Sequence, residues 1–246
     1  MTKKALITGA TSGFGEAAAR LFVADGWQVI GTGRRQERLD ALAGELGAGF
    51  RPVRLDMRDL AAVEAFAAEM DAVDLLLNNA GLASPLTPLQ EAEWGPLAQV
   101  IETNISGLVQ LTRLLLPGLI ARKGAVINIS SVAASYPYRG GAVYGGSKAF
   151  VREFSLCLRA DLHGTGVRVT SIEPGMAETE FTLVRNGWDQ EASDRLYAGV
   201  EPMTAEDIAR TVHWVATLPP HLNINTLELM PVNQDFGGFA VARPGA

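Results

Sequence analysis

The sequence predicts an α/β fold in which helices cover both faces of a parallel β-sheet. Short apolar segments with the character of buried strands alternate with longer segments whose apolar residues recur at helical spacing. Because parallel strands need long crossover connections, usually helices, this alternation indicates repeated strand–helix–strand units. No internal repeat and no linker rich in Gly, Ser or Pro interrupts the pattern, so residues 1–246 are predicted to form a single domain.

The composition favours a protein that binds a small molecule. Hydrophobic residues make up 48% of the 246 residues, which is sufficient for one large core. Twenty-one Lys and Arg residues against 27 Asp and Glu residues give a net charge of −6, and no basic run is sustained. This charge balance argues against a nucleic-acid surface or an anionic-membrane surface.

Cysteine and histidine usage argues against disulfides and metal sites. The single cysteine, Cys157, excludes an internal disulfide and a cysteine-based zinc cluster, and its apolar helical surroundings predict a core position. The three histidines, His163, His213 and His221, lack metal-ligand spacing, so we expect them to be structural and no metal to be bound. A strand begins within the first few residues in place of a signal peptide, and no apolar run approaches the roughly 18 residues that cross a bilayer. A soluble, cytoplasmic protein is therefore expected.

The first strand and helix flank a glycine-rich loop. Residues 3–8 are predicted as a strand and residues 16–24 as a helix, and the loop between them contains Gly9, Thr11, Ser12, Gly13, Phe14 and Gly15. This arrangement directs backbone N–H groups and a helix N-terminus at a phosphate, and glycine lets the backbone approach closely. Tight turns also use glycine, but the strand–helix context favours a dinucleotide phosphate site.

The second strand indicates which dinucleotide is bound. Residues 28–32 are the predicted strand, and Gly33, Arg34 and Arg35 follow it. NAD-binding units usually place a carboxylate here to hold the ribose, whereas two guanidinium groups suit a 2′-phosphate. We therefore expect NADP rather than NAD. The alternative is that these arginines only begin a solvated helix at 36–46.

The next two strands also end in polar or small residues. Residues 51–55 are predicted as a strand, after which Asp56 and Met57 border the adenine, or Asp56 caps the helix at 59–70. Residues 73–78 form another strand, followed by Asn79, Ala80 and Gly81 in a turn whose backbone must pass close to another group.

The middle of the chain is predicted to contain one long helix. A Pro-rich loop at 84–96 leads into a helix at 93–122 that carries Asn104 in its interior. Asn is slightly unfavourable there, so it needs either solvent or a purpose. Pro117 should kink this helix near its end.

The candidate catalytic residues lie between positions 128 and 148. A strand at 125–130 ends beside Ser131, and a helix at 143–163 carries Tyr144 and Lys148 on one face. A phenol has a pKa of roughly 10 and a nearby ammonium favours the phenolate, so Lys148 would tune Tyr144 as a proton donor and acceptor. The Ser131 hydroxyl would hold a substrate oxygen. Tyr-x-x-x-Lys alone also occurs as an exposed helical pair, so the catalytic interpretation depends on the other motifs in the chain.

The last third of the chain completes the pattern. A strand at 167–172 is followed by Pro174, Gly175 and Thr179, and residues 178–200 form a long polar connection that we expect to be an active-site lid. A helix at 205–218 and a strand at 225–230 close the domain. Residues 232–246 are predicted to be a tail that is loose or docked on a partner.

Together these motifs resemble the short-chain dehydrogenase/reductase family over nearly the whole chain. The residues that carry the resemblance are Thr8-Gly9-x-x-x-Gly13-x-Gly15, Asn78-Asn79-Ala80-Gly81, Asn104, Ser131, Tyr144-x-x-x-Lys148 and Pro174-Gly175-x-x-x-Thr179. The resemblance implies a Rossmann-type domain with a seven-stranded doubly wound parallel sheet, an NADP(H) cofactor and a homotetramer.

The resemblance also implies a catalytic tetrad, which consists of Asn104, Ser131, Tyr144 and Lys148. Tyr144 would shuttle the hydroxyl proton while hydride moves between the nicotinamide and the substrate carbon. Asn104 would hold a water for proton relay, and Lys148 would also bind the nicotinamide ribose. Thr179, with the backbone after Pro174, would bind the carboxamide.

A closer similarity narrows the substrate class. The segments that resemble NADP-dependent 3-hydroxy acid dehydrogenases are 31–39, 136–138, 148–152, 161–165, 172–175 and 223–228. This group acts on serine, allo-threonine, 3-hydroxypropionate and malonic semialdehyde, and sulfoacetaldehyde reductases are near relatives. Small anionic substrates need a cation, for which Arg185 in the expected lid and Arg139 are the candidates. Arg139 is equally compatible with a surface position.

Two other function classes share single features with this sequence. A non-catalytic NADP-binding regulator would have no reason to retain all four catalytic residue types. A serine hydrolase is suggested by Gly145-Gly146-Ser147-Lys148. It lacks the second glycine of a nucleophile elbow, and Ser147 falls inside a predicted helix rather than at a strand-to-helix turn.

Overall fold

A single seven-stranded sheet runs through the computed structural model, which describes residues 2–236. All neighbouring strands are parallel and their order is β3-β2-β1-β4-β5-β6-β7. The strands are β1 Lys4–Thr8, β2 Gln28–Gly33, β3 Phe50–Arg54, β4 Leu75–Asn78, β5 Ala125–Ile129, β6 Arg168–Pro174 and β7 Thr226–Leu229. The predicted fold class, a Rossmann-type parallel sheet of seven strands, is confirmed.

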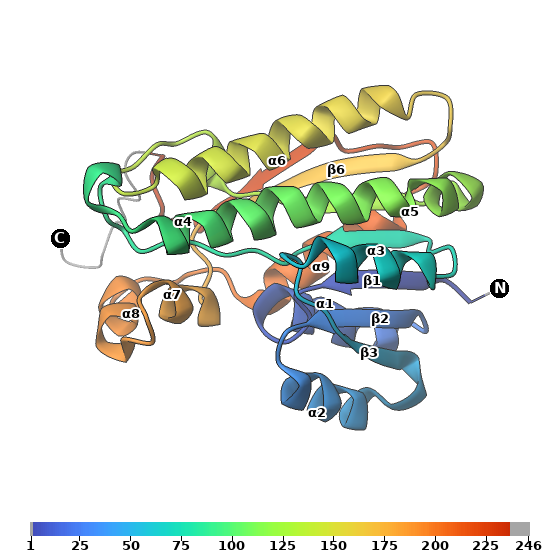
Figure 1. Cartoon of the computed structure of the whole chain (residues 1–246), viewed down its shortest axis with the longest axis horizontal. Helices are drawn as coiled ribbons and strands as arrows, with labels where there is room; N and C mark the ends of the chain where they lie inside the picture. The colour runs from blue at the N-terminus through green and yellow to red at the C-terminus, as the bar shows by residue number, and fades with distance from the viewer. Residues whose placement is uncertain (1, 237–246) are drawn as a thin grey trace.

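Helices cover the sheet on both faces (Figure 1). Their bounds are α1 Gly13–Ala24, α2 Gln36–Leu46, α3 Leu60–Ala68, α4 Trp94–Ile101, α5 Leu108–Arg122, α6 Ala142–Asp161, α7 Glu180–Arg185, α8 Gln190–Tyr197 and α9 Ala205–Thr217. Side chains of α1, α2 and α9 build one hydrophobic core, and side chains of α3, α5 and α6 build the other. The strands therefore lie buried between two helical layers.

Strand β1 shows why the strand sequences are apolar throughout. Ala5, Leu6 and Ile7 are all fully buried. Ala5 and Ile7 pack into the core beneath α1 and α9, whereas Leu6 packs into the core on the opposite face. Because successive side chains of a strand point to opposite faces, a sheet covered on both sides needs unbroken apolar runs.

The sheet also fixes where a ligand can enter. The chain builds β1, β2 and β3 outward in one direction and then returns to place β4 on the other side of β1. The loops that follow β1 and β4 consequently leave in opposite directions and open a crevice at the carboxyl ends of the strands.

The long helix predicted at 93–122 is one continuous element. Its irregularity is a π-helical segment in the middle and not the kink expected at Pro117. α4 and α5 are joined by the π-helical segment Glu102–Gly107, and the α-helical assignment of α5 continues through Pro117. A Cβ on Gly107 would lie 2.1 Å from the carbonyl oxygen of Met57, so the packing at this segment is tight. π segments are rare and occur mostly at functional sites, and this one contains Asn104.

The same helix corrects the expectation that no segment could span a membrane. By length and composition Trp94–Arg122 is apolar enough to do so. Its α5 part instead packs into the core through Leu108, Leu111, Leu115 and Leu119, which are buried. This part of the helix therefore belongs to the hydrophobic core.

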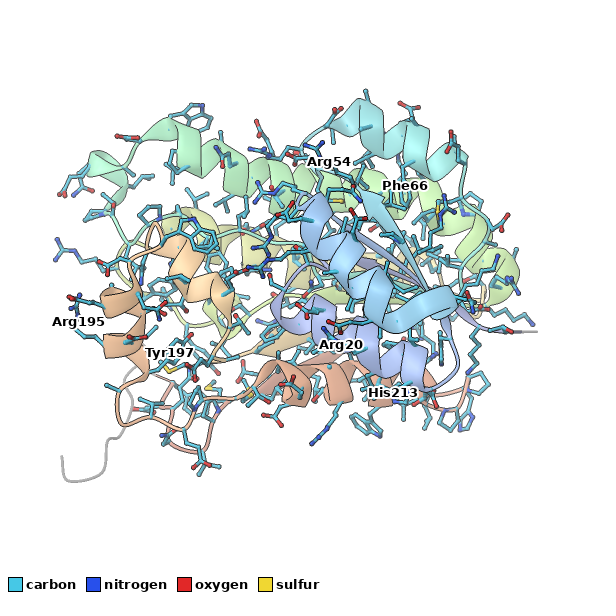
Figure 2. The ribbon with its side chains drawn as sticks, turned by 90° about the horizontal axis from the view of Figure 1, so that it is seen from below. Arg20, Arg54, Phe66, Arg195, Tyr197 and His213 are labelled. Carbon is cyan, nitrogen blue, oxygen red and sulfur yellow. The ribbon has the colours of Figure 1, made fainter. Side chains whose placement is uncertain are left out.

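The segment predicted to be a lid contains two short helices, α7 and α8, which lie apart from the other helices at one end of the sheet (Figure 1). Thr179 and Asp189 cap their N-termini through their side chains. The hydroxyl of Tyr197, which Figure 2 shows on α8, lies 2.6 Å from the hydroxyl of Thr182 and donates to the carbonyl of Ala177. The two helices are thus tied together and to the end of the sheet.

Two other expectations changed or fell partly outside the described residues. Cys157 is exposed, so its predicted core position is wrong: α6 is amphipathic, and Val151, Ser155 and Leu158 form its buried side. The predicted tail at 232–246 is described only to residue 236. In that part Gln234 accepts a hydrogen bond of 2.6 Å from the backbone N–H of Met176.

Candidate active site

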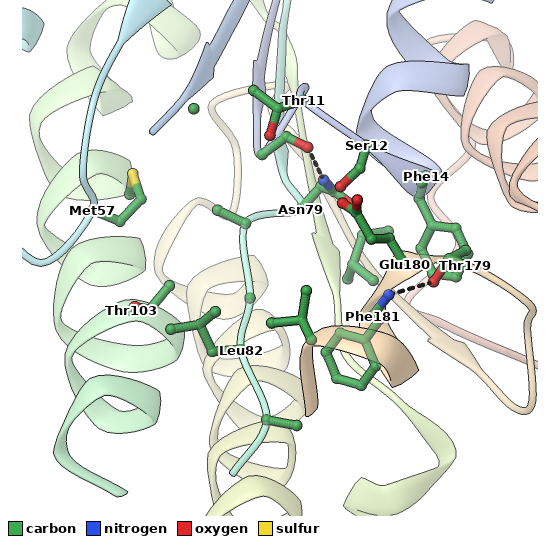
Figure 3. A pocket seen from close by; sticks show the side chains of 18 of the residues that line it. Thr11, Ser12, Phe14, Met57, Asn79, Leu82, Thr103, Thr179, Glu180 and Phe181 are labelled. Atoms are coloured by element: carbon green, nitrogen blue, oxygen red, sulfur yellow. Dashed lines mark hydrogen bonds between the residues drawn. The ribbon is translucent and has the colours of Figure 1, made fainter. Parts of the chain in front are cut away.

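A cavity of about 390 Å³ lies in the crevice at the carboxyl ends of the strands. Apart from Gly15, every residue predicted to bind the cofactor lines it: Gly9, Thr11, Ser12, Gly13, Phe14, Arg34, Arg35, Asp56, Met57, Asn79, Ala80, Gly81, Tyr144, Lys148, Pro174, Gly175 and Thr179. Figure 3 shows several of these side chains around the cavity. Residues from five strand ends and from the lid are therefore brought together, as the resemblance implies.

The glycine loop is shaped by close backbone contacts. Gly9 and Gly13 adopt φ angles of +69° and +53°, which disfavour other residues. A Cβ on Gly15 would lie 2.3 Å from the carbonyl oxygen of Gly9. The Asn79 amide ties the loop to β4 by donating to the carbonyls of Thr8, at 2.8 Å, and Gly9, at 3.1 Å. Above this cradle lies the N-terminus of α1, where a phosphate is favoured, so the loop fits a dinucleotide.

Gly15→Ala is expected to destabilise the protein by about 1–3 kcal/mol and to weaken NADP(H) binding, because the added methyl group collides with the backbone of Gly9. Chemical denaturation and NADPH fluorescence would measure the two effects. Gly44→Ala is a matched control, since a Cβ on Gly44 in α2 meets nothing within 4 Å and should slightly stabilise the helix. Equal behaviour of the two variants would contradict the assignment of the loop.

The end of β2 explains the expected preference for NADP. A Cβ on Gly33 would lie 2.4 Å from Cγ2 of Thr11, so a carboxylate side chain does not fit at this position. Arg34 is exposed at the edge of the cavity, and no hydrogen bond or ion pair joins its guanidinium to another residue within 2–236. The Arg35 guanidinium is instead engaged: Nη1 lies 2.7 Å from the Glu180 carboxylate and Nη2 donates to Ser12 Oγ at 2.9 Å.

Asp56 lines the cavity but does not cap a helix. The Asp56 carboxylate accepts hydrogen bonds from the side chain and the backbone of Arg58, which lower its pKa below the usual value. The N-cap of α3 is Asp59, whose side chain accepts from the backbone N–H of Ala62. The alternative in which Asp56 is the N-cap is therefore wrong.

Ser131, Tyr144 and Lys148 meet on the opposite side of the cavity. The Lys148 ammonium lies 5.8 Å from the centre of the Tyr144 ring and donates to the carbonyl of Ile129 at 2.8 Å. Ser131 follows β5, and its hydroxyl accepts from the backbone N–H of Ala133 and hydrogen-bonds the Tyr144 phenol. All three side chains are buried. The Ser131 hydroxyl also donates to the carbonyl of Pro174 at 3.4 Å.

The electrostatics of the pair differ from the prediction that Lys148 acidifies Tyr144. Burial raises the pKa of Tyr144 to about 12, opposed by the hydrogen bond to Ser131 and by the charge of Arg185. Burial also lowers the pKa of Lys148 to about 8. Burial is the largest cause of the pKa shift at both groups, and the Lys148 ammonium faces the carbonyl of Ile129. In this structure the cation that favours the phenolate is Arg185.

Asn104 fastens the loop after β4. Its Oδ1 accepts from the backbone N–H of Leu82 at 2.8 Å, and its Nδ2 donates to the Leu82 carbonyl and to Ser147 Oγ, each at 2.9 Å. Asn104 does not line the cavity, although a Cβ on neighbouring Gly81 would lie 3.5 Å from its Oδ1 and 3.3 Å from the Lys148 ammonium. The geometry therefore gives Asn104 a positioning role, and its water-holding role stays a prediction.

The two candidate substrate cations differ in position. The Arg185 guanidinium lies 5.3 Å from the centre of the Tyr144 ring, and it donates to the Tyr138 hydroxyl at 2.7 Å and to the Ser84 carbonyl at 3.2 Å. Neither arginine is among the residues that line the cavity, and Arg139 is exposed and has no such contact with the Tyr144 ring. Arg185 is consequently the cation beside the reacting groups.

Several site residues had not been singled out from the sequence. Phe181 lies with its ring centre 5.7 Å from that of Tyr144, and Trp188 lines the cavity from the turn after α7. Tyr138 binds Arg185, and Glu180 lines the cavity beside Arg35. The available signals were that Phe181, Trp188 and Glu180 belong to the expected lid and that Tyr138 lies in the segment 136–138, which carries part of the resemblance. Within residues 2–236 no group of His, Cys, Asp and Glu side chains has the composition to hold a metal.

A family model described as "short chain dehydrogenase" matches residues 3–190. The chain belongs to the short-chain dehydrogenase family. Serine 3-dehydrogenase of Agrobacterium fabrum is 61% identical over 247 residues, which cover 99% of both chains. The NADP-dependent 3-hydroxy acid dehydrogenase YdfG of Escherichia coli (strain K12) is 50% identical over 244 residues, or 97% of this chain and 98% of the relative.

Among solved structures, this short-chain dehydrogenase is similar to the closed form of a serine dehydrogenase complexed with NADP⁺. That structure has 50% sequence identity and a TM-score of 0.93, and the match covers 98% of this chain and 99% of that one. The family assignment made from the motifs is confirmed, and so is the parallel α/β architecture.

Proposed function

We propose that the chain is an NADP-dependent dehydrogenase that oxidises the hydroxyl group of small 3-hydroxy acids, serine among them. The observation that carries the substrate class is the Arg185 guanidinium, which lies 5.3 Å from the centre of the Tyr144 ring. The surrounding lining, Leu82, Phe181, Val184 and Trp188, is apolar. A guanidinium beside a proton-transferring phenol suits a small molecule that carries a carboxylate near its hydroxyl. The named relatives support this class.

Tyr144, Ser131 and Arg185 would have different roles in the reaction at the substrate oxygen. When bound, the nicotinamide supplies the acceptor for the hydride that leaves the carbinol carbon. Tyr144 takes the hydroxyl proton, and Ser131 donates a hydrogen bond to the same oxygen, since these two side chains are already hydrogen-bonded to each other. Arg185 offsets part of the cost of ionising the buried phenol. In the reverse direction Tyr144 returns the proton to the aldehyde or ketone oxygen.

Cofactor selectivity is assigned to the end of β2. The glycine loop and α1 would hold the pyrophosphate, and Arg34 would bind the 2′-phosphate, with Arg35 beside it between Glu180 and Ser12. Asp56 and Met57 would border the adenine, while Pro174, Gly175 and Thr179 would flank the nicotinamide. The catalytic assignment of Asn104, Ser131, Tyr144 and Lys148 belongs to the same proposal.

A substrate panel tests the function. NADP⁺ reduction is expected with serine, allo-threonine and 3-hydroxypropionate, and NADPH oxidation with malonic semialdehyde. Sulfoacetaldehyde tests the sulfonate alternative, because a guanidinium also binds a sulfonate. If no member of the panel reacted while NADPH still bound tightly, the chain would instead be an NADP-binding regulator.

Arg185→Ala is expected to raise KM for serine by about 10- to 100-fold, because it removes a charged hydrogen-bonding partner from the carboxylate. The same change should raise KM for a neutral alcohol much less. Arg139→Ala is the matched control: this arginine is exposed and outside the cavity, so it should leave both KM values unchanged. Equal losses for acid and neutral alcohol in Arg185→Ala would refute carboxylate binding.

The proposal also includes a cellular location, an assembly and a domain organisation. A single cysteine, which is free and exposed, suits a reducing compartment, so we assign the protein to the cytoplasm. We also assign it a homotetrameric assembly and a single domain spanning residues 1–246 with a lid at about 178–200. Light scattering of the purified protein would test the assembly.

A further inference from the structure

The lid helix α7 makes side-chain contacts with other segments at both of its ends. Its last residue, Arg185, binds Tyr138 and Ser84 on the substrate side of the cavity. Its first residue, Glu180, reaches to the nucleotide side. Figure 3 shows the Glu180 side chain beside Ser12 of the glycine loop. A six-residue helix thus bridges the two halves of the cavity.

The contact at Glu180 joins segments more than 140 residues apart. Oε2 of Glu180 lies 2.7 Å from Nη1 of Arg35, and Oε1 lies 2.7 Å from Nη2 of Arg38, so one carboxylate bridges two guanidinium groups. Arg35 in turn donates to Ser12 Oγ at 2.9 Å and to Thr11 Oγ1 at 3.2 Å. The lid is thereby connected to the glycine loop through one arginine.

The carboxylate is shielded and charged. The Glu180 side chain is 17% exposed, compared with 29% for Arg35 and 44% for Arg38. Although burial opposes ionisation, the hydrogen bond from Arg35 and the charges of Arg35 and Arg38 hold the pKa of Glu180 below its ordinary value. Ion pairs organised into such a network contribute more than isolated surface pairs.

The same contact separates the roles of the two arginines at the end of β2. The guanidinium of Arg35 is occupied by Glu180, Ser12 and Thr11. Arg34 has no comparable partner within residues 2–236 and stands at the edge of the same cavity. Arg34 is therefore the guanidinium available to a 2′-phosphate, whereas Arg35 is already committed to holding the lid against the glycine loop.

We propose that Glu180 is a positioning residue whose bridge to Arg35 and Arg38 latches the lid over the bound dinucleotide, and that this latch acts equally on NADP and NAD. This proposal rests on the cofactor site proposed for the chain. The dinucleotide phosphates would lie between the glycine loop and α7, so the latch must open before the cofactor leaves. Its strength then sets the cofactor release rate without setting the choice between the two cofactors.

The test measures cofactor alone, without substrate. Stopped-flow fluorescence would give the NADPH release rate, and calorimetry would give Kd for NADP⁺ and NAD⁺. Glu180→Gln is expected to speed NADPH release about fivefold and to raise both Kd values by the same factor. Adding Arg38→Gln to Glu180→Gln should have little further effect, because both changes break one shared contact. Glu180→Asp should restore part of the slow release.

Arg34→Ala is the contrasting variant, since it should weaken NADP⁺ binding and leave NAD⁺ binding unchanged. The latch would be refuted if Glu180→Gln tightened NADP⁺ binding selectively, because the carboxylate would then be a competitor of the 2′-phosphate. Unchanged release and Kd values in a variant of normal melting temperature would refute it as well. Failure of the 3-hydroxy acid proposal would appear in the substrate panel and would leave these binding measurements as they are.

Discussion

Tyr144→Phe is expected to lower kcat for the oxidation of serine by about 10²- to 10⁴-fold, the usual contribution of a positioned acid–base group. The phenol hydroxyl is the only atom removed, and it is the group that is hydrogen-bonded to Ser131 at the end of the cavity. The ring itself packs against Phe181 and is 7% exposed, so its apolar contacts persist in the variant. Steady-state kinetics with NADP⁺ and serine would measure the loss.

The pH profile provides a second measure of the same residue. Because burial raises the pKa of Tyr144 to about 12, the phenolate that accepts the proton is scarce at neutral pH. Oxidation should therefore accelerate as the pH rises, whereas the reverse reduction, which needs the protonated phenol, should not. In Tyr144→Phe the residual oxidation should lose this alkaline rise, and Kd for NADP⁺ should stay within about twofold of the original value. Retention of full turnover by Tyr144→Phe would remove the basis of the mechanism.

Features that depend on neighbouring residues could be predicted from the sequence. The strands follow from short apolar runs, the glycine loop from Gly9, Gly13 and Gly15, and the candidate catalytic face from the four-residue spacing of Tyr144 and Lys148. Their assembly at one edge follows from the parallel order of the strands. These predictions needed only chain order and the periodicity of regular elements.

Features that depend on distant contacts could not be predicted. Glu180 meets Arg35 across 145 positions, and Arg185 meets Ser84 across 101. Neither pair has a local pattern, since both depend on how α7 lies across the sheet edge. The π-helical segment at Glu102–Gly107 is similar: it arises where Gly107 packs against the backbone of Met57, a contact that no helical periodicity reveals.

The error about Tyr144 has a different origin. Sequence spacing placed an ammonium near a phenol, and the simple Coulomb argument predicted a lower pKa for the phenol. Burial of both groups reverses that outcome, because each is pushed toward its neutral form. Burial is a property of the whole fold, so it could not enter an argument from spacing. Burial of the Lys148 charge also lowers the free energy of unfolding.

Lys148→Met is expected to stabilise the protein against unfolding by about 2 kcal/mol at pH 7 while reducing kcat by about 10²-fold or more. The ammonium is buried, and its pKa falls from 10.5 to about 8 because burial disfavours the charge. Keeping it protonated in the folded state at pH 7 therefore costs stability, and the hydrogen bond to Ile129 recovers only part of that cost. Methionine has similar length and no charge, so it removes the penalty.

The sign of the pH dependence distinguishes this cause from a change in packing. Below pH 8 the lysine is protonated in both the folded and the unfolded chain, so the penalty is present in full. Between pH 8 and 10.5 the unfolded chain binds more protons than the folded chain, so the stability of the original protein rises with pH and the advantage of Lys148→Met shrinks. Urea denaturation of both proteins across this range would measure the difference. A pH-independent difference for Lys148→Met would contradict a buried charge as its origin.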